Sequence, residues 1–255
     1  MEIILTLAIL LAASVAILSI GGLVARLKFH ASRSDFVNTQ LTYQALLLCV
    51  ALAVVFAIFL IDQRNFSKFF AVGRIAAPAR GVPLLGIPGG HSWLVIGTYL
   101  SVVITLVTAT FIYFNFRGSV GKAGLLLPLF PWILLFSVTN AFAEEVIYRF
   151  GVVIPLFGHV DPAAILLISA FAFGATHFRG VPGGPVGVLM AGLLGWLLAK
   201  SVIETSGLFW AWSIHSLQDV VIFSALALSA ALKRQAATMR PPSPEASAAA
   251  RQLRG

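Results

Sequence analysis

The chain has 255 residues, of which 59% are hydrophobic and only 10% are charged, and its formal net charge is +8. A mean hydropathy of +0.97 excludes an ordinary soluble domain, and a single cysteine, Cys49, excludes a disulfide framework or a thiolate metal cluster. The composition indicates a polytopic membrane protein, whose basic residues set its orientation and contact anionic lipid head groups rather than nucleic acid. No alternating strands are visible, so we expect an all-α transmembrane helix bundle.

Apolar segments long enough to cross a hydrocarbon core of roughly 30 Å occur seven times along the chain. An eighth span would result if the stretch from 124 to 156, or the last span, broke into two. Cys49 falls within the second span, where we expect it to pack against other helices. The predicted spans are residues 3–25, 40–61, 93–116, 124–143, 162–178, 184–203 and 208–232.

The segments between the spans carry the residues that break helices and set topology. Residues 62–92 are rich in Gly, Pro and Arg and predict a long loop, and Asp161 precedes a span whose first turn it can cap. Arg26 and other basic residues follow the first span, which predicts an uncleaved segment whose C-terminal end is cytoplasmic. A basic tail puts the C terminus on the same side, but the basic residues of the 62–92 loop would then face outward.

Three charged residues lie within one apolar segment, "NAFAEEVIYRFG" at 140–151. An intramembrane charge costs roughly 2.5–3.5 kcal/mol to insert, so Glu144, Glu145 and Arg149 all need partners. Glu145 and Arg149 are four residues apart with the acid first, the favourable order for a helical ion pair. Glu144 lies about 100° round the helix from Glu145 and needs a partner from another helix or a water-filled cavity. A purely structural ionic cluster between helices is the alternative.

Two later spans contribute histidines. The segment "FAFGATHF" places Phe173 and His177 one helical turn apart, and "WSIHSLQD" does the same for His215 and Asp219. A single intramembrane histidine is more often a hydrogen-bonded core residue. Ionisable groups near the middle of three helices, however, predict a shared polar cavity with a function.

These groups limit the chemistry that such a cavity can perform. A carboxylate removed from water can act as a general base toward a water molecule, and a histidine can polarise that water or protonate a leaving amine. Together they could hydrolyse an amide. Two histidines and a carboxylate could instead hold Zn²⁺ with an open coordination position. The sequence has no HExxH motif, no GxSxG elbow and no Gly-rich phosphate loop.

The order and spacing of these motifs resemble a known family. "EEVIYR" fits EExxxR, "FGATH" fits FxxxH, and "HSLQD" fits HxxxN or HxxxD. Residues 128–232 therefore resemble the CAAX protease and bacteriocin-processing family, also called the Abi family, and within it the type II CAAX prenyl proteases. The resemblance implies a helical bundle with a water-filled cavity, an endopeptidase activity on membrane-associated proteins or peptides, and a location in the cell membrane of a bacterium or archaeon.

The resemblance also implies roles for individual residues. Glu144 matches the glutamate that activates water, while Glu145 and Arg149 match the supporting acid and base. His177 matches the histidine that helps to hold the water, and His215, with the residue one turn later, matches the pair that stabilises the oxyanion. On this basis the chain divides into N-terminal helices with a basic loop, a catalytic membrane domain and a disordered cytoplasmic tail, at residues 1–123, 124–233 and 234–255.

Several alternatives stay open at this stage. Asp219 stands where the prenyl proteases carry Asn, and an ionised Asp cannot donate to an oxyanion, so it either orients His215, is protonated or binds a metal. We expect no cofactor; if Zn²⁺ is bound, the ligands would be Glu144, His177 and His215. A non-catalytic immunity or assembly factor is a second possible function. A proton-coupled transporter is the third, and the lack of an internal repeat argues against it.

Overall fold

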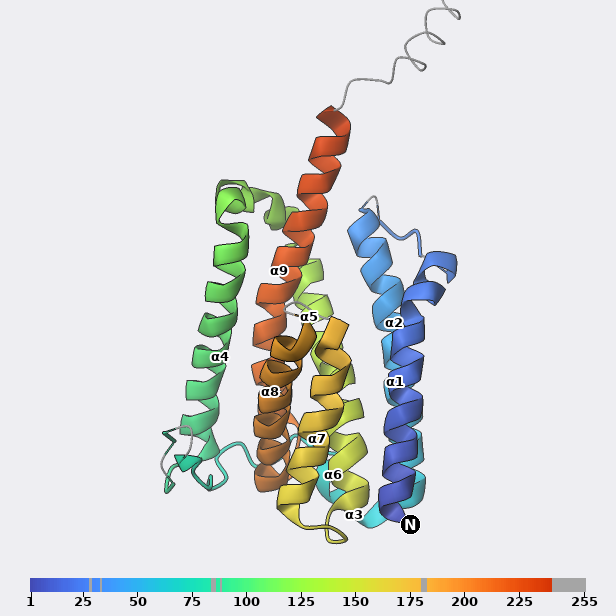
Figure 1. Cartoon of the computed structure of the whole chain (residues 1–255), viewed down its shortest axis with the longest axis vertical. Helices are drawn as coiled ribbons and strands as arrows, with labels where there is room; N and C mark the ends of the chain where they lie inside the picture. The colour runs from blue at the N-terminus through green and yellow to red at the C-terminus, as the bar shows by residue number, and fades with distance from the viewer. Residues whose placement is uncertain (28, 33, 84–85, 88, 180–182, 240–255) are drawn as a thin grey trace, which may run out of the picture.

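A computed structural model describes residues 1–27, 29–32, 34–83, 86–87, 89–179 and 183–239. Across these residues the chain forms a bundle of long helices connected by short turns and one extended loop (Figure 1). The predicted all-α transmembrane bundle is therefore confirmed. The long helices are α1 (Glu2–Leu27), α2 (Asp35–Ile61), α4 (Trp93–Phe116), α5 (Phe130–Glu145), α7 (Pro162–Thr176), α8 (Gly184–Thr205) and α9 (Phe209–Met239).

The number of long helices agrees with the predicted seven spans. Six stretches of the described chain are long and apolar enough to cross a membrane, and one of them, Trp93–Leu156, has 64 residues. That stretch contains both α4 and α5, which run in opposite directions (Figure 1). Between them, residues Arg117–Leu129 form a 3-10 helix with three glycines and Pro128. These residues explain why the helical span predicted to start at 124 begins only at Phe130.

Two predicted boundaries and one predicted contact differ in the structure. Ser34 caps α2 by accepting a hydrogen bond from the backbone N–H of Val37, so this helix starts before residue 40. The tail was predicted to be disordered from 234, but α9 continues to Met239, and residues 240–255 lie outside the described part of the chain. Cys49 is exposed on the outside of α2, so the prediction that it packs against other helices is wrong.

The centre of the bundle is formed by a single helical run. α5 passes through a π-helical turn, Val146–Phe150, directly into α6 (Gly151–Leu156). Every residue from Glu145 to Leu156 is buried, because α1, α2, α7 and α8 surround this run. The charged segment that stood out in the sequence therefore lies at the core of the protein rather than facing lipid.

The loop at 62–92 is fixed against the end of α8. It begins with α3 (Gln63–Phe69) and then crosses the turn between α8 and α9. The backbone N–H of Arg74 donates to the carbonyl of Thr205, at 2.8 Å. Gly73 and Gly207 approach so closely that a Cβ on Gly73 would lie 2.8 Å from the backbone of Gly207. Glycine is needed at both positions, and this contact holds the loop in place.

Candidate active site

A fully buried ion pair forms the base of the candidate site. Glu145 is the last residue of α5, and the π-helical turn that follows carries Arg149; both side chains are 0% exposed. The Arg149 Nε lies 2.9 Å from Glu145 Oε2, and its Nη2 donates to Oε1 at 3.0 Å. π-helical turns are rare and often occur at functional sites. The pairing expected from the spacing is present, in a two-point geometry that fixes both side chains.

His215 of α9 joins this pair to the cavity. Its Nδ1 lies 2.8 Å from Glu145 Oε1, and because a carboxylate accepts, this contact makes Nδ1 the donor. The ring stands edge-on to Phe173 of α7, with 5.7 Å between centroids. Arg149 lies over the same phenyl ring, 4.3 Å from its centroid. Glu145, Arg149 and Phe173 together fix the plane of the imidazole and leave its Nε2 pointing away from Glu145.

Two more carboxylates lie near the Nε2 atom of His215. Glu144 Oε2 is 3.8 Å away and Asp219 Oδ1 is 3.7 Å away. Asn140 holds these two carboxylates together, since its Nδ2 donates to Glu144 Oε1 at 3.2 Å and to Asp219 Oδ2 at 3.0 Å. The contacts from His215 are longer than hydrogen bonds. Glu144, Asp219 and His215 therefore leave space between them.

That space belongs to a cavity of about 280 Å³ between α4, α5, α7, α8 and α9. Glu144, His177, His215 and Asp219 all line it, whereas the Glu145–Arg149 pair lies behind its wall. Much of the remaining wall is apolar. The structure thus brings four of the six predicted site residues to one cavity and places the other two as the support beneath His215.

His177 lies where α7 ends and a 3-10 turn begins. Its Nδ1 is 2.9 Å from the carbonyl oxygen of Phe173 and 3.4 Å from the Thr176 hydroxyl. A carbonyl can only accept, so Nδ1 carries the proton and Nε2 is left with its lone pair. This arrangement suits a histidine that accepts a hydrogen bond from a water molecule in the cavity.

Amide groups that were not predicted from the sequence surround the carboxylates. Asn140 Oδ1 accepts from Gln44 Nε2 of α2 at 3.3 Å, and Gln44 Oε1 accepts from the Thr139 hydroxyl at 3.2 Å. Asn140 stands four residues before Glu144, so the helical spacing could have identified it. Gln44 ends a stretch of mixed polarity at residues 38–44 that precedes an apolar run, and only the packing of α2 against α5 explains its position.

A metal centre does not fit the arrangement of these side chains. In the part of the chain that the structure describes, no three His, Cys, Asp or Glu side chains are grouped so that they could hold a metal ion. The set suggested for Zn²⁺, Glu144, His177 and His215, is therefore not arranged as a ligand set.

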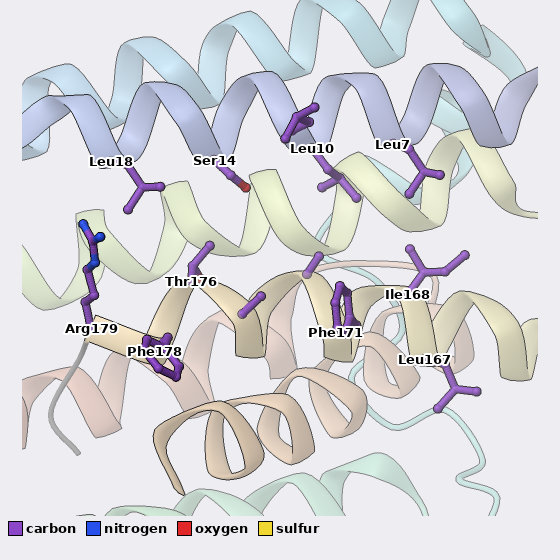
Figure 2. Close-up of a pocket in the computed structure, with 13 residues that line it drawn as sticks. Leu7, Leu10, Ser14, Leu18, Leu167, Ile168, Phe171, Thr176, Phe178 and Arg179 are labelled. Atoms are coloured by element: carbon purple, nitrogen blue, oxygen red, sulfur yellow. The ribbon is translucent and has the colours of Figure 1, made fainter. Parts of the chain in front are cut away.

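A second large cavity lies between α1 and α7 and has a different chemical character. Its volume is about 650 Å³, and Figure 2 shows Leu7, Leu10 and Leu18 of α1 facing α7. The polar groups among its lining residues are the hydroxyls of Ser14 and Thr176, with Arg179 at one end. No carboxylate or imidazole lines this groove among the described residues, so it lacks the groups that amide hydrolysis requires.

Comparison with known proteins gives one result for the region that contains the site. Residues 126–221 match the family model described as "Type II CAAX prenyl endopeptidase Rce1-like". The matched region includes every residue of the predicted site, from Glu144 to Asp219, and largely overlaps residues 128–232, where the motif resemblance was found. No curated protein and no solved structure matches the chain.

Proposed function

Because residues 126–221 form a domain of the Type II CAAX prenyl endopeptidase Rce1-like family, we propose that this integral membrane protein is an intramembrane endopeptidase with Glu144 as its general base. The observation that carries the proposal is the single cavity lined by Glu144, His177 and His215. Its substrate is a protein or peptide associated with the membrane. Residues 124–233 are proposed as the catalytic domain.

The first step is the attack of water on the scissile carbonyl carbon. A water between Glu144 and His177 donates one hydrogen bond to the carboxylate and one to Nε2 of the imidazole. Glu144 takes a proton as the water oxygen bonds to the carbonyl carbon, and the carbonyl π electrons move to oxygen. General base catalysis of this kind contributes typically 10²- to 10⁴-fold to a rate.

The second step is stabilisation and collapse of the tetrahedral intermediate. In its doubly protonated form, His215 can donate from Nε2 to the oxyanion, because Nδ1–H is held by Glu145. The C–N bond then breaks, and the protonated Glu144 gives its proton to the leaving amine. This regenerates the carboxylate, so one side chain serves as base and then as acid.

Asp219 acts in this scheme through its neighbours. Its Oδ2 accepts from Asn140 and its Oδ1 faces the Nε2 of His215 at 3.7 Å. An ionised carboxylate cannot donate to an oxyanion, so we assign Asp219 to the orientation of His215. The Asn140 amide donates to both Asp219 and Glu144 and so bridges the two carboxylates.

The apolar wall of the cavity indicates how a substrate would be held. Phe111 of α4, Met190 and Leu194 of α8, and Leu226 of α9 form much of it. Such a wall would take an extended, apolar stretch of polypeptide and would exclude bulk water from the reacting bond. This favours a substrate segment that is itself embedded in the bilayer.

The experiment compares the purified chain with its Glu144→Gln variant in lipid nanodiscs. Membrane peptides are incubated with each protein, and new termini are identified by mass spectrometry. We expect Glu144→Gln to lower the cleavage rate by about 10²- to 10⁴-fold, and His177→Ala to lower it as well. Glu2→Gln, which removes a carboxylate outside the cavity, is the matched control and should cleave normally.

A non-catalytic membrane factor would give a different pattern. If Glu144→Gln cleaves as fast as the natural chain, or if no peptide is cut while the cellular function survives the substitution, the proposal is wrong. The polar cluster would then have a structural role, and only changes in Glu145 or Arg149 would affect the cell.

A further inference from the structure

A second polar pocket lies at the end of the bundle where α7 begins and α8 ends, near the N terminus (Figure 1). Its volume is about 670 Å³, and it shares no lining residue with the active-site cavity. Arg74 and Arg80 of the long loop line it together with Lys200 and Glu204 of α8. The rest of its wall is largely apolar.

Backbone contacts fix the two arginines at this position. The N–H of Arg74 donates to the carbonyl of Thr205 at 2.8 Å, and the N–H of Arg80 donates to Glu204 Oε2 at 3.1 Å. Trp93 Nε1 donates to the same carboxylate oxygen at 2.8 Å. The loop is therefore attached to α8 through the backbone of both arginines, which line the pocket.

The charges in the pocket are unbalanced. Glu204 is its one acidic lining residue, and this carboxylate is already occupied by the Lys200 ammonium and by the two N–H groups described above. Lys200 and Glu204 are both largely buried, whereas Arg74 and Arg80 are exposed. Within the described chain, neither arginine side chain forms an ion pair. Two positive charges thus face the pocket without a counterion.

The first turn of α7 adds to this positive potential. Pro162 and Ala163 line the pocket, and a 15-residue helix directs the positive end of its dipole there. Asp161 caps this helix by accepting from the N–H of Ala163 at 2.8 Å, which offsets part of the effect. Guanidinium groups have the planar fork of donors that matches phosphate oxygens.

We propose that this pocket binds a phosphate group, held by the two uncompensated guanidinium groups of Arg74 and Arg80. The apolar side chains of Phe157, Leu166 and Ile203 in the same pocket suit the glycerol and first acyl carbons of an anionic phospholipid. The shared chemistry is the phosphate, which a lipid head group or free inorganic phosphate can supply. The proposal concerns a site apart from the catalytic cavity and does not rest on the proteolytic function.

The test uses the purified full chain in a neutral detergent. Native mass spectrometry measures how much phosphatidylglycerol and how much phosphatidylcholine each protein retains. We expect the natural chain to retain phosphatidylglycerol preferentially, and Arg74→Gln/Arg80→Gln to bind it about 30-fold more weakly, from the usual contribution of two basic side chains. Arg74→Lys/Arg80→Lys, which keeps the charge, should recover part of the affinity.

The control variant is Arg64→Gln/Arg117→Gln, which removes the same charge from two exposed arginines outside the pocket and should bind normally. The thermal unfolding midpoint, measured in phosphate and in chloride buffers of equal ionic strength, distinguishes a lipid head group from free inorganic phosphate as the source of the phosphate group. If phosphate raises the midpoint of the natural chain but not of Arg74→Gln/Arg80→Gln, and no lipid is retained, the ligand is free phosphate. Equal lipid retention by Arg74→Gln/Arg80→Gln and by Arg64→Gln/Arg117→Gln would overturn the proposal. So would a natural chain that binds neither phosphatidylglycerol nor free phosphate.

Discussion

Replacing Arg149 by Met should destabilise the protein far more than the loss of one surface charge. Both Arg149 and Glu145 are 0% exposed, and two contacts of 2.9 and 3.0 Å join them. Methionine keeps the length of the side chain and most of its apolar packing. The substitution therefore isolates the guanidinium group, and it leaves the carboxylate of Glu145 in the core with His215 as its remaining polar neighbour.

The magnitude follows from the burial of the carboxylate that is left. Removing one partner of a buried ion pair costs about 3–5 kcal/mol, because the other charge remains unpaired in a medium of low polarity. Arg149 also lies 4.3 Å from the Phe173 centroid, a cation–π contact worth about 0.5–2 kcal/mol. We expect Arg149→Met to lower the free energy of unfolding by about 4 kcal/mol.

The double variant Glu145→Gln/Arg149→Met tests the cause. It leaves no unpaired charge, and the Gln side-chain oxygen can still accept from His215 Nδ1. We expect it to be more stable than Arg149→Met alone by at least about 2 kcal/mol. Reversible unfolding in mixed micelles gives the free energies of unfolding of the natural chain, of the single variants Arg149→Met and Glu145→Gln, and of the double variant. If the double variant loses the sum of the two single losses, the reasoning from an unpaired buried charge is wrong.

Two further predictions concern the carboxylate pair and the packing of α4. Asn140→Ala removes the donor that joins Glu144 to Asp219, so the turnover number should fall by about 10²-fold while KM changes little. Peptide cleavage kinetics measure both quantities. Thr98→Ala, which removes an exposed hydroxyl of α4 outside the cavity, is the control, and an unchanged turnover number for Asn140→Ala would contradict the reasoning. Gly97→Ala would place a Cβ 2.3 Å from the indole ring of Trp210 and should cost about 1–3 kcal/mol, measured as a lower thermal midpoint. Gly22→Ala, which meets nothing within 4 Å, should have little effect; equal midpoints for these two variants would contradict the packing argument.

The sequence was most informative where local spacing determines contact. The i, i+4 relation of Glu145 and Arg149 predicts their ion pair, because residues four apart share a helix face whatever surrounds them. Asp161 caps α7 for the same local reason. The three motifs also led to the family whose model matches residues 126–221, since the order and spacing of motifs can be read without knowledge of the fold.

Contacts between distant helices could not be predicted in this way. Gln44 reaches Asn140 across 96 positions of the chain, and nothing in the residues around it indicates this partner. The exposed position of Cys49 depends on the rotation of α2, which the uniformly apolar run at residues 45–61 does not determine. The attachment of the 62–92 loop to α8 depends on Gly73 meeting Gly207, a contact that either glycine alone would not suggest.

The environments of the two adjacent glutamates explain why we assign the base to Glu144. Both oxygens of Glu145 face Arg149, its Oε1 also contacts His215, and the side chain is 0% exposed, so neither oxygen faces the cavity. Glu144 is 16% exposed, has one oxygen bound by Asn140, and has its other oxygen 3.8 Å from His215 Nε2. A general base must reach the water whose proton it removes. Although Glu144 and Glu145 are adjacent in the helix, the Glu145 carboxylate can only orient His215, whereas the Glu144 carboxylate can reach a water molecule in the cavity.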